Sequence, residues 1–398
     1  MKKKQLPPVA IISAPFGMGG AIPGAEYGPQ ALLRAGLAER LQALGRTVTC
    51  TTAEVTRQQE RTQQLPLTNQ AHTEQAPRLP QTNPAHTEQA PHLPQTNPAH
   101  TEQAPHLPQT TQAQTVQTQQ SPQPVPSIQA PKDTSSRTPS EQADSNTSNG
   151  DRANTRSSTE PNPVKNIEEV LAICRLIAQN VKQAADAGAF PLLIGGDHSV
   201  AMGSLAGLSR SGKRLGVIWL DAHGDINSEQ TSPTGNAHGM VLSVATGLSW
   251  LKLQEICDTG ALLDPHRIVI VGARDLDDGE KRILAHRGIR CFTMSDVDRL
   301  GIRSVMKRAV AAAGNGTDGI HVSLDLDVLD PQEAPGVGTP VPGGLTYREA
   351  RYAMEMLYES GAVTSMDIVE VNPMLDPGGR TAELAVSLAE TLFGKRLI

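Results

Sequence analysis

The sequence predicts an α/β protein of three αβα layers, in which a doubly wound parallel sheet carries helices on both faces and one long insert interrupts it. Two observations predict this class. Short apolar runs of strand length alternate with segments of helical periodicity through most of the chain, which is typical of parallel sheets covered on both faces. Metal-binding residue types follow three of the apolar runs, and open α/β sheets bind their ligands beyond the carboxyl ends of the strands.

Residues 1–56 are expected to begin this α/β domain. The apolar run 9–13 predicts a strand, residues 29–44 repeat leucines at helical spacing behind Pro29, and residues 47–51 can form a second short strand. The glycine-rich loop after the first strand lacks the G-x-G-x-x-G spacing. A dinucleotide site is therefore only weakly supported.

Residues 57–163 differ in composition from the rest of the chain. They are rich in Gln, Thr, Pro and Ser, contain no Phe, Tyr or Trp, and repeat a fourteen-residue unit from Leu65 to His106. Each unit offers too little apolar surface to offset the entropy of ordering, so a disordered insert is expected rather than a solenoid. Five histidines here allow weak metal binding, but repetition of a polar sequence explains them more simply.

Residues 164–398 are expected to complete the domain. Asn166 and Glu169 have the spacing of a capping box, and an apolar helical face follows in residues 167–181. Further strands are expected at 191–194, 215–220, 268–271, 289–293, 320–324 and 364–371, and further helices at 202–210, 279–286, 301–313 and 347–359.

Three of these strands run into candidate metal ligands. Asp221, His223 and Asp225 follow one strand at alternating positions, so extended backbone would place them on one face. The other two strand ends supply His198, Asp325 and Asp327. A polar loop is the simpler explanation for any single Asp. Parallel strands, however, bring all three ends to one edge of the sheet, so the six side chains can converge.

Carboxylates gathered in this way would repel one another unless cations neutralised them. Oxygen ligands with two imidazoles suit Mn(II), with Fe(II), Co(II) and Ni(II) as competitors, and four scattered cysteines argue against a structural zinc site. Two ions about 3.5–4 Å apart could hold a hydroxide as nucleophile. The residues therefore predict a binuclear hydrolytic site.

Several motifs, taken in order, resemble the ureohydrolases and most closely arginase. The stretches 195–199 (GGDHS), 221–227 (DAHGDIN) and 323–327 (SLDLD) resemble the ureohydrolase signatures, and 231–240, 334–340, 343–349 and 370–373 resemble arginase. The resemblance covers essentially all of the chain outside the insert. It implies the arginase-like fold, two Mn²⁺ per subunit, and hydrolysis of L-arginine to L-ornithine and urea by a metal-bridging hydroxide. It also implies homo-oligomers, either trimers or hexamers.

The resemblance also implies residue roles. One ion would be held by His198, Asp221, Asp225 and Asp325, and the other by Asp221, His223, Asp325 and Asp327, so that Asp221 and Asp325 bridge. Asp225 or His238 would supply a proton to the leaving amine, and Glu370 would pair with the guanidinium. The substrate residues would be Asn227, Thr234 and Asn236 for the α-carboxylate, Asp277 and Glu280 for the α-amino group, and Thr339 in the lining.

Simpler explanations stay open for some of these residues. His238 could cap a loop, and Asp277 and Glu280 could stabilise the start of a helix through its dipole. Two other activities also stay open: an agmatinase or another guanidino-acid ureohydrolase, and a catalytically silent binding protein on the same fold. Loss of a ligand would be expected of a silent protein, yet all six ligand positions are filled.

Bulk properties predict a cytoplasmic protein without a nucleic-acid or membrane partner. Charge is nearly balanced, with 35 basic and 41 acidic residues, and no apolar run reaches the length of a membrane span. The cysteines lack C-x-x-C spacing and are expected to be thiols in a reducing compartment.

Overall fold

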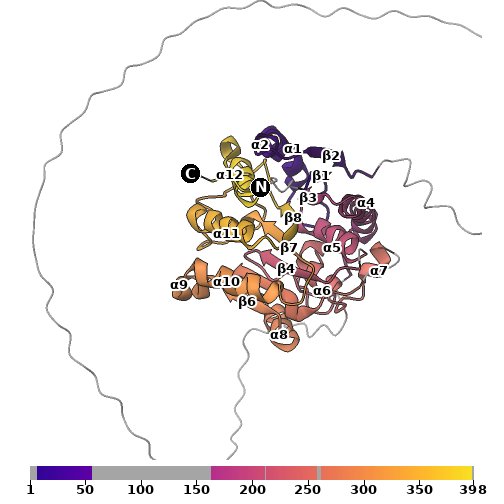
Figure 1. Ribbon diagram of the computed structural model, residues 1–398. Coiled ribbons are helices and arrows are strands. Elements are labelled where there is room, and N and C mark those ends of the chain that lie inside the picture. Colours follow the sequence, from indigo (N-terminus) through magenta and orange to yellow (C-terminus); the bar gives the residue numbers. More distant parts are fainter. Residues whose placement is uncertain (1–6, 56–162, 211, 258–260, 397–398) are drawn as a thin grey trace, which may run out of the picture. The chain divides into compact units, whose positions relative to one another are not determined.

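The computed structural model describes residues 7–55, 163–210, 212–257 and 261–396. They belong to one of the two units into which the chain divides, residues 1–66 with 156–398 (Figure 1). Apart from Pro163, the expected insert 57–163 lies outside the described residues.

One parallel sheet of eight strands runs through the described part, in the order β2-β1-β3-β8-β7-β4-β5-β6. The strands are β1 (Val9–Ala14), β2 (Val48–Thr52), β3 (Phe190–Gly195), β4 (Leu215–Leu220), β5 (Ile268–Ala273), β6 (Arg290–Thr293), β7 (Gly319–Asp325) and β8 (Val363–Val369). All neighbouring pairs are parallel, and the four central strands β3, β8, β7 and β4 are almost wholly buried. The predicted doubly wound sheet is confirmed.

Helices cover both faces of this sheet (Figure 1). Their bounds are α1 (Gly28–Arg34), α2 (Leu37–Ala43), α4 (Ile167–Asp186), α5 (Ala201–Ser209), α6 (Val241–Ala245), α7 (Leu253–Ile256), α8 (Asp278–Arg287), α9 (Met294–Leu300), α10 (Ile302–Ala313), α11 (Tyr347–Ser360) and α12 (Arg380–Leu392). Strand β4 shows how the two cores form, because successive strand residues point to opposite faces. Ile218 and Leu220 pack toward α10, α11 and α12, whereas Val217 and Trp219 pack toward α4, α5 and α6.

Two local predictions were wrong, and one helix, α9, was not expected. The leucine spacing over 29–44 predicts one helix, but the chain breaks it into α1 and α2 at Gly36, whose φ of 85° favours glycine. Helix α9 precedes the helix expected at 301–313, and Gly301 separates the two. The capping box at α4 does not form: the Asn166 amide donates instead to the Met18 carbonyl at 2.7 Å. This tertiary contact replaces the local cap.

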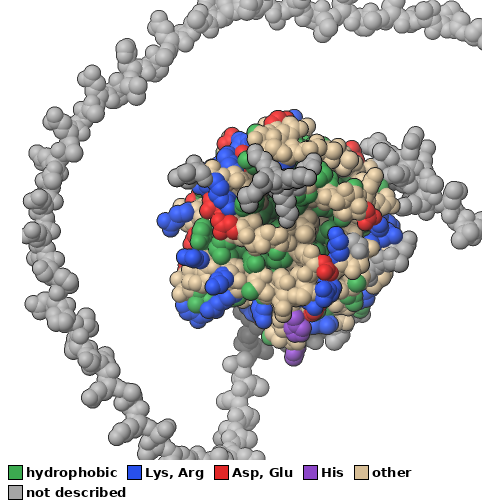
Figure 2. All heavy atoms as spheres, viewed as in Figure 1, with side chains coloured by type: hydrophobic (Ala, Val, Ile, Leu, Met, Phe, Trp, Pro, Cys, Tyr) green, Lys and Arg blue, Asp and Glu red, His purple; other side chains and the backbone are tan. Residues whose placement is uncertain are grey.

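None of the helices in the described ranges combines the length and apolar character needed to cross a bilayer. On the face shown in Figure 2, acidic and basic side chains both occur, in keeping with the nearly balanced composition.

Helices α4 and α5 approach closely because α5 presents glycine to α4. A Cβ added at Gly203 would lie 2.7 Å from Ile177 Cβ and 2.8 Å from the Cys174 carbonyl oxygen. Both neighbours are buried, and one of them is backbone, so neither can move aside easily.

We expect Gly203→Ala to lower the free energy of unfolding by about 1–3 kcal/mol, since it overpacks this contact. Urea denaturation would measure the change. Lys182→Ala, on the solvent side of α4, is the control and should shift stability by less than about 0.5 kcal/mol. Equal effects of the two variants would contradict the packing argument.

Candidate metal and substrate site

The candidate ligands lie where central strands end. His198 follows β3, Asp221 follows β4, Asp325 closes β7, and Glu370 follows β8. These strands are adjacent and parallel, so their carboxyl ends meet at one edge of the sheet. The structure therefore brings the three predicted strand ends together.

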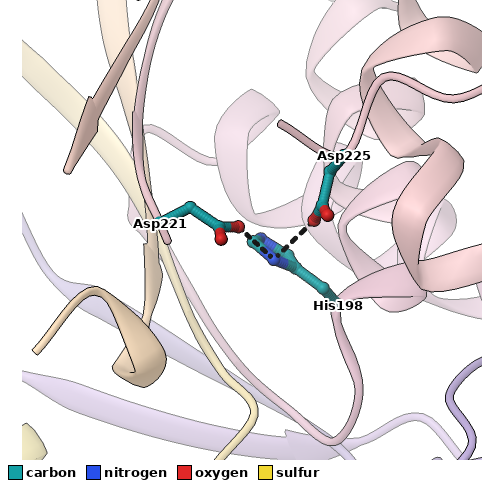
Figure 3. Close-up of side chains that lie close together, drawn as sticks. All are labelled: His198, Asp221 and Asp225. Atoms are coloured by element: carbon teal, nitrogen blue, oxygen red, sulfur yellow. Dashed lines mark ion pairs between the residues drawn. The ribbon is translucent and has the colours of Figure 1, made fainter. Parts of the chain in front are cut away.

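A first group of ligands surrounds His198. Its Nδ1 atom lies 3.1 Å from Asp221 Oδ2, 3.0 Å from Asp225 Oδ2 and 3.0 Å from Asp325 Oδ2. Figure 3 shows the imidazole between two of these carboxylates, Asp221 and Asp225. His198, Asp221 and Asp225 are close enough together to hold one metal ion.

A second group shares Asp221 with the first. His223 Nδ1 lies 3.0 Å from Asp327 Oδ2 and 3.4 Å from Asp221 Oδ1, so Asp221 presents one oxygen to each histidine. Asp221, His223 and Asp327 are again spaced to hold an ion. Asp325 contacts the first group through Oδ2, while its Oδ1 accepts the Asp327 backbone N–H at 2.8 Å. Its bridging role stays a prediction.

These residues fit divalent cations, as the surroundings of His198 show. Its Nδ1 is buried without a hydrogen-bond partner among the described residues, although three carboxylate oxygens lie beside it. Its Nε2 is already engaged with Ser323 Oγ at 2.8 Å, which leaves Nδ1 as the nitrogen that faces the acids. An imidazole lone pair and several carboxylates converging on one point form the donor set of a hard or borderline metal ion.

The pKa values of these acids reflect the crowding. Burial and the neighbouring Asp221 carboxylate raise the pKa of Asp225 to about 6, and burial with two nearby carboxylates raises the pKa of Asp325 well above its usual range. Burial also opposes the charge of Asp221, but contacts with His198 and His223 lower the pKa of that group. Burial and repulsion therefore oppose the ionisation of Asp225 and Asp325, and a bound cation would offset both effects.

Two residues that the sequence analysis missed hold the ligands in place. The Trp219 indole stacks on the His198 ring, with centroids 4.1 Å apart and planes 4° apart, and its N–H donates to Asp221 Oδ2 at 2.9 Å. Ser323 Oγ lies within hydrogen-bond distance of His198 Nε2, the ring nitrogen that does not face the acids. Both precede an aspartate ligand by two positions and therefore share its strand face. That alternation was the signal available in the sequence.

Backbone strain also marks the site. Asp225 and Glu370 have φ values of 47° and 63°, and Asn166 is the third non-glycine residue with positive φ in the described ranges. Such conformations are uncommon for non-glycine residues and cluster at functional sites. Both Asp225 and Glu370 contact His198, so the strained positions coincide with the candidate site.

His238, which is partly exposed, pairs with the buried Glu370 beside the first group. His238 Nδ1 lies 3.3 Å from Glu370 Oε1, and the same oxygen accepts the His198 backbone N–H at 2.7 Å. Burial opposes the charge of His238, but the contact with Glu370 raises its pKa to about 9. Burial likewise opposes the charge of Glu370, yet His238 lowers the pKa of that carboxyl. The imidazolium and the carboxylate stabilise each other.

A pocket of about 170 Å³ opens onto these groups. Its lining is His223, Asp225, Asn227, Ser232, Pro233, Thr234, His238, Gly239, Asp277, Glu280, Asp325, Asp327 and Thr339. Most of the predicted substrate residues are therefore brought together. Thr339 Oγ1 donates to Asp327 Oδ2 at 3.1 Å. Asn236 is not in the lining: it is buried, and its Oδ1 accepts a hydrogen bond from Lys165.

Asp277 and Glu280 lie both at a helix start and in the lining of the pocket. They form the capping box of α8, in which Glu280 Oε2 accepts the Asp277 backbone N–H at 3.0 Å. They also face the pocket, and Asp277 Oδ2 accepts from Asn227 Nδ2 at 2.8 Å. Burial raises the pKa of Glu280 to about 7. Asn227 Oδ1 is buried without a partner in the described structure, so this amide can accept one more hydrogen bond.

A model of the arginase family matches residues 130–394, more than half of the chain. The arginase of Bacillus caldovelox is 49% identical over 235 residues, which cover 59% of this chain and 79% of that protein. Its native structure is similar with a TM-score of 0.71 and 34% identity, over 99% of this chain and 100% of that one. The chain belongs to the arginase family.

Membership makes the chain an arginase-type hydrolase, acting on the C–N bonds of guanidino substrates. The structure of Entamoeba histolytica arginase in complex with L-ornithine is similar with a TM-score of 0.67 and 25% identity, over 98% of this chain and 99% of that one. The agmatine ureohydrolase of Thermoplasma volcanium, at 17% identity and a TM-score of 0.55 over 97% of this chain and 88% of that one, shares the fold. Family membership argues against the silent binding protein.

If both ligand groups hold ions, Mn(II) added to metal-free protein should raise its melting temperature, because the ion binds the folded state and relieves repulsion among buried carboxylates. Asp221→Asn should lose most of that shift, since Asp221 is common to both groups. Differential scanning fluorimetry with increasing Mn(II) would measure it.

Asp278→Asn is the matched control. Its side chain is 83% exposed and does not line the pocket. Asp278→Asn removes one negative charge, as Asp221→Asn does. A Mn(II)-induced shift in Asp221→Asn as large as in this control would contradict the assignment of the ligands.

Proposed function

We propose that this member of the arginase family hydrolyses L-arginine to L-ornithine and urea with two Mn²⁺ ions per subunit. The observation that carries the proposal is the pair of His–Asp groups that share Asp221 and border one pocket. His198, Asp221, Asp225 and Asp325 would hold one ion. Asp221, His223, Asp325 and Asp327 would hold the other. Mn(II) is favoured by a donor set of carboxylates and two imidazoles.

The chemistry assigns a task to each polar group near the ions. Divalent ions bound here would lower the pKa of a water molecule and so supply the nucleophile near neutral pH. Glu370 is held by the His198 backbone N–H and keeps a lowered pKa, so it can pair as a carboxylate with the guanidinium and orient it.

A proton must also reach the leaving amine. The pKa of His238 is raised to about 9, above neutral pH, so its imidazole carries a proton that can be donated. Asp225 lines the same pocket and is the second candidate donor. Both His238 and Asp225 line the pocket, and Asp225 also belongs to the first ligand group.

The rim of the pocket offers groups for an α-amino acid. Asp277 and Glu280 are acids that suit an ammonium group, and Asn227 and Thr234 offer hydrogen bonds to a carboxylate. The ornithine complex of the Entamoeba histolytica arginase supports an amino acid as the ligand, because ornithine is the expected product. Agmatine lacks the carboxylate and would leave that part of the rim unpaired.

We further propose that the protein forms a homo-oligomer, either a trimer or a hexamer, and acts in the cytoplasm. This part of the proposal rests on the resemblance to arginase and on the composition.

Urea release tests the proposal. Purified protein stripped with a chelator should be inactive, and Mn(II) should restore urea formation from L-arginine. Agmatine should react with a kcat/KM at least about 100-fold lower, because a site built to bind a polar group rejects an analogue that lacks it. Wild-type protein never exposed to chelator is the control.

Preference for agmatine or guanidinobutyrate would keep the metal groups but contradict the amino-acid assignment. Urea formation that survives complete chelation would contradict the metal assignment.

A further inference from the structure

The charged residues that line the pocket are predominantly acidic. Its lining contains five carboxylates and two histidines, and neither Lys nor Arg belongs to it. The guanidinium and the ammonium of an amino-acid substrate suit such a pocket. The α-carboxylate does not, because like charges in a partly buried site repel. A cation close to the carboxylate end of the pocket would offset that repulsion.

Lys165 brings such a cation to the loop over residues 231–240. Its backbone N–H donates to the Gly235 carbonyl at 2.9 Å, and its Nζ donates to Asn236 Oδ1 at 3.1 Å. Gly235 directly follows Thr234, which lines the pocket, and Thr234 Oγ1 accepts the Asn236 backbone N–H at 3.2 Å. One residue therefore contacts two consecutive loop residues, through its main chain and its charge.

The segment that carries Lys165 is itself anchored. Asn166 donates from its side chain to the Met18 carbonyl at 2.7 Å and has a φ of 50°, the left-handed conformation that Asn tolerates better than most residues. Helix α4 starts at the next residue and packs its buried face on α5. Lys165 is thus placed between a rigid helix and the loop, and its position is not set by the loop alone.

We propose that Lys165 is a specificity-determining positioning residue for the carboxylate end of the substrate. Its ammonium holds the Asn236 amide oxygen, which fixes the turn that presents Thr234, and its positive charge offsets the acids of the pocket at that end. The inference rests on the proposed function, since it takes an α-amino acid as substrate. Lys165 acts through the loop and the local potential, and it does not touch the reacting atoms.

The test compares two inhibitors that differ only in the carboxylate. L-Ornithine carries it, and putrescine is the same diamine without it. We expect Lys165→Met to weaken inhibition by L-ornithine about 5- to 10-fold and to raise the KM for L-arginine by a similar factor, with little change in kcat, as for the loss of one partly exposed charge. Inhibition by putrescine should be unchanged, and Lys165→Arg should recover most of the ornithine affinity.

Two controls separate this role from a structural one. Lys182→Met removes a lysine from the exposed side of α4, the helix that follows Lys165, where it pairs with Asp186, and it should leave inhibition by both compounds unchanged. The rise in melting temperature produced by L-ornithine measures binding independently of turnover and should fall only in Lys165→Met.

Equal weakening of ornithine and putrescine in Lys165→Met would show a structural tether and overturn the proposal, as would no weakening of either. Failure of the proposed function is visible separately. If wild-type protein releases urea only from agmatine, inhibition by L-ornithine and by putrescine can be measured against that substrate. A Lys165→Met variant that weakens inhibition by ornithine but not by putrescine would still support a role of Lys165 in favouring ligands with a carboxylate.

Discussion

Buried negative charge is the constraint on which the site depends. Asp221, Asp225, Asp325 and Asp327 are each less than 8% exposed and lie within one cluster. Burying an isolated carboxylate is very costly in free energy, and contacts with only two histidines offset a limited part of that cost for four aspartates. Burial and the neighbouring carboxylates raise the pKa values of Asp225 and Asp325, because ionising either group adds repulsion to the cluster. Cations would neutralise the same cluster without protonating it, and this links the architecture to metal-dependent chemistry.

The sheet explains how so much charge is concentrated. Four adjacent parallel strands end at one edge, and the residues two positions before Asp221 and Asp325 support the ligands from within the strands. Trp219 belongs to the apolar core on one face of the sheet and still donates to Asp221, so the core and the site are one structure. Side chains set on strand ends are positioned more rigidly than side chains on free loops, which suits a site that must hold ions at fixed spacing.

The sequence allowed the sheet, the strand ends and the convergence of six ligands to be predicted, because period-two and helical patterns are local and parallel topology follows from their alternation. The break between α1 and α2 has a local cause, the left-handed conformation of Gly36, which the leucine spacing alone did not reveal. The failure of the Asn166 cap could not be predicted, since it depends on a tertiary contact from Asn166 to Met18. The same holds for Lys165: only the folded chain shows that a residue before α4 contacts a loop about seventy positions later. The sequence offered a helix start and a pocket residue as alternatives for Glu280, and the structure shows that it both caps α8 and lines the pocket.

One measurement tests the central claim most directly: a crystal structure of the protein grown with Mn(II), with anomalous data collected at the manganese edge. The account predicts two anomalous peaks per subunit on either side of Asp221, one beside His198 and the other beside His223. Absence of peaks at these residues in active crystals, or a single peak that does not contact Asp221, would contradict it.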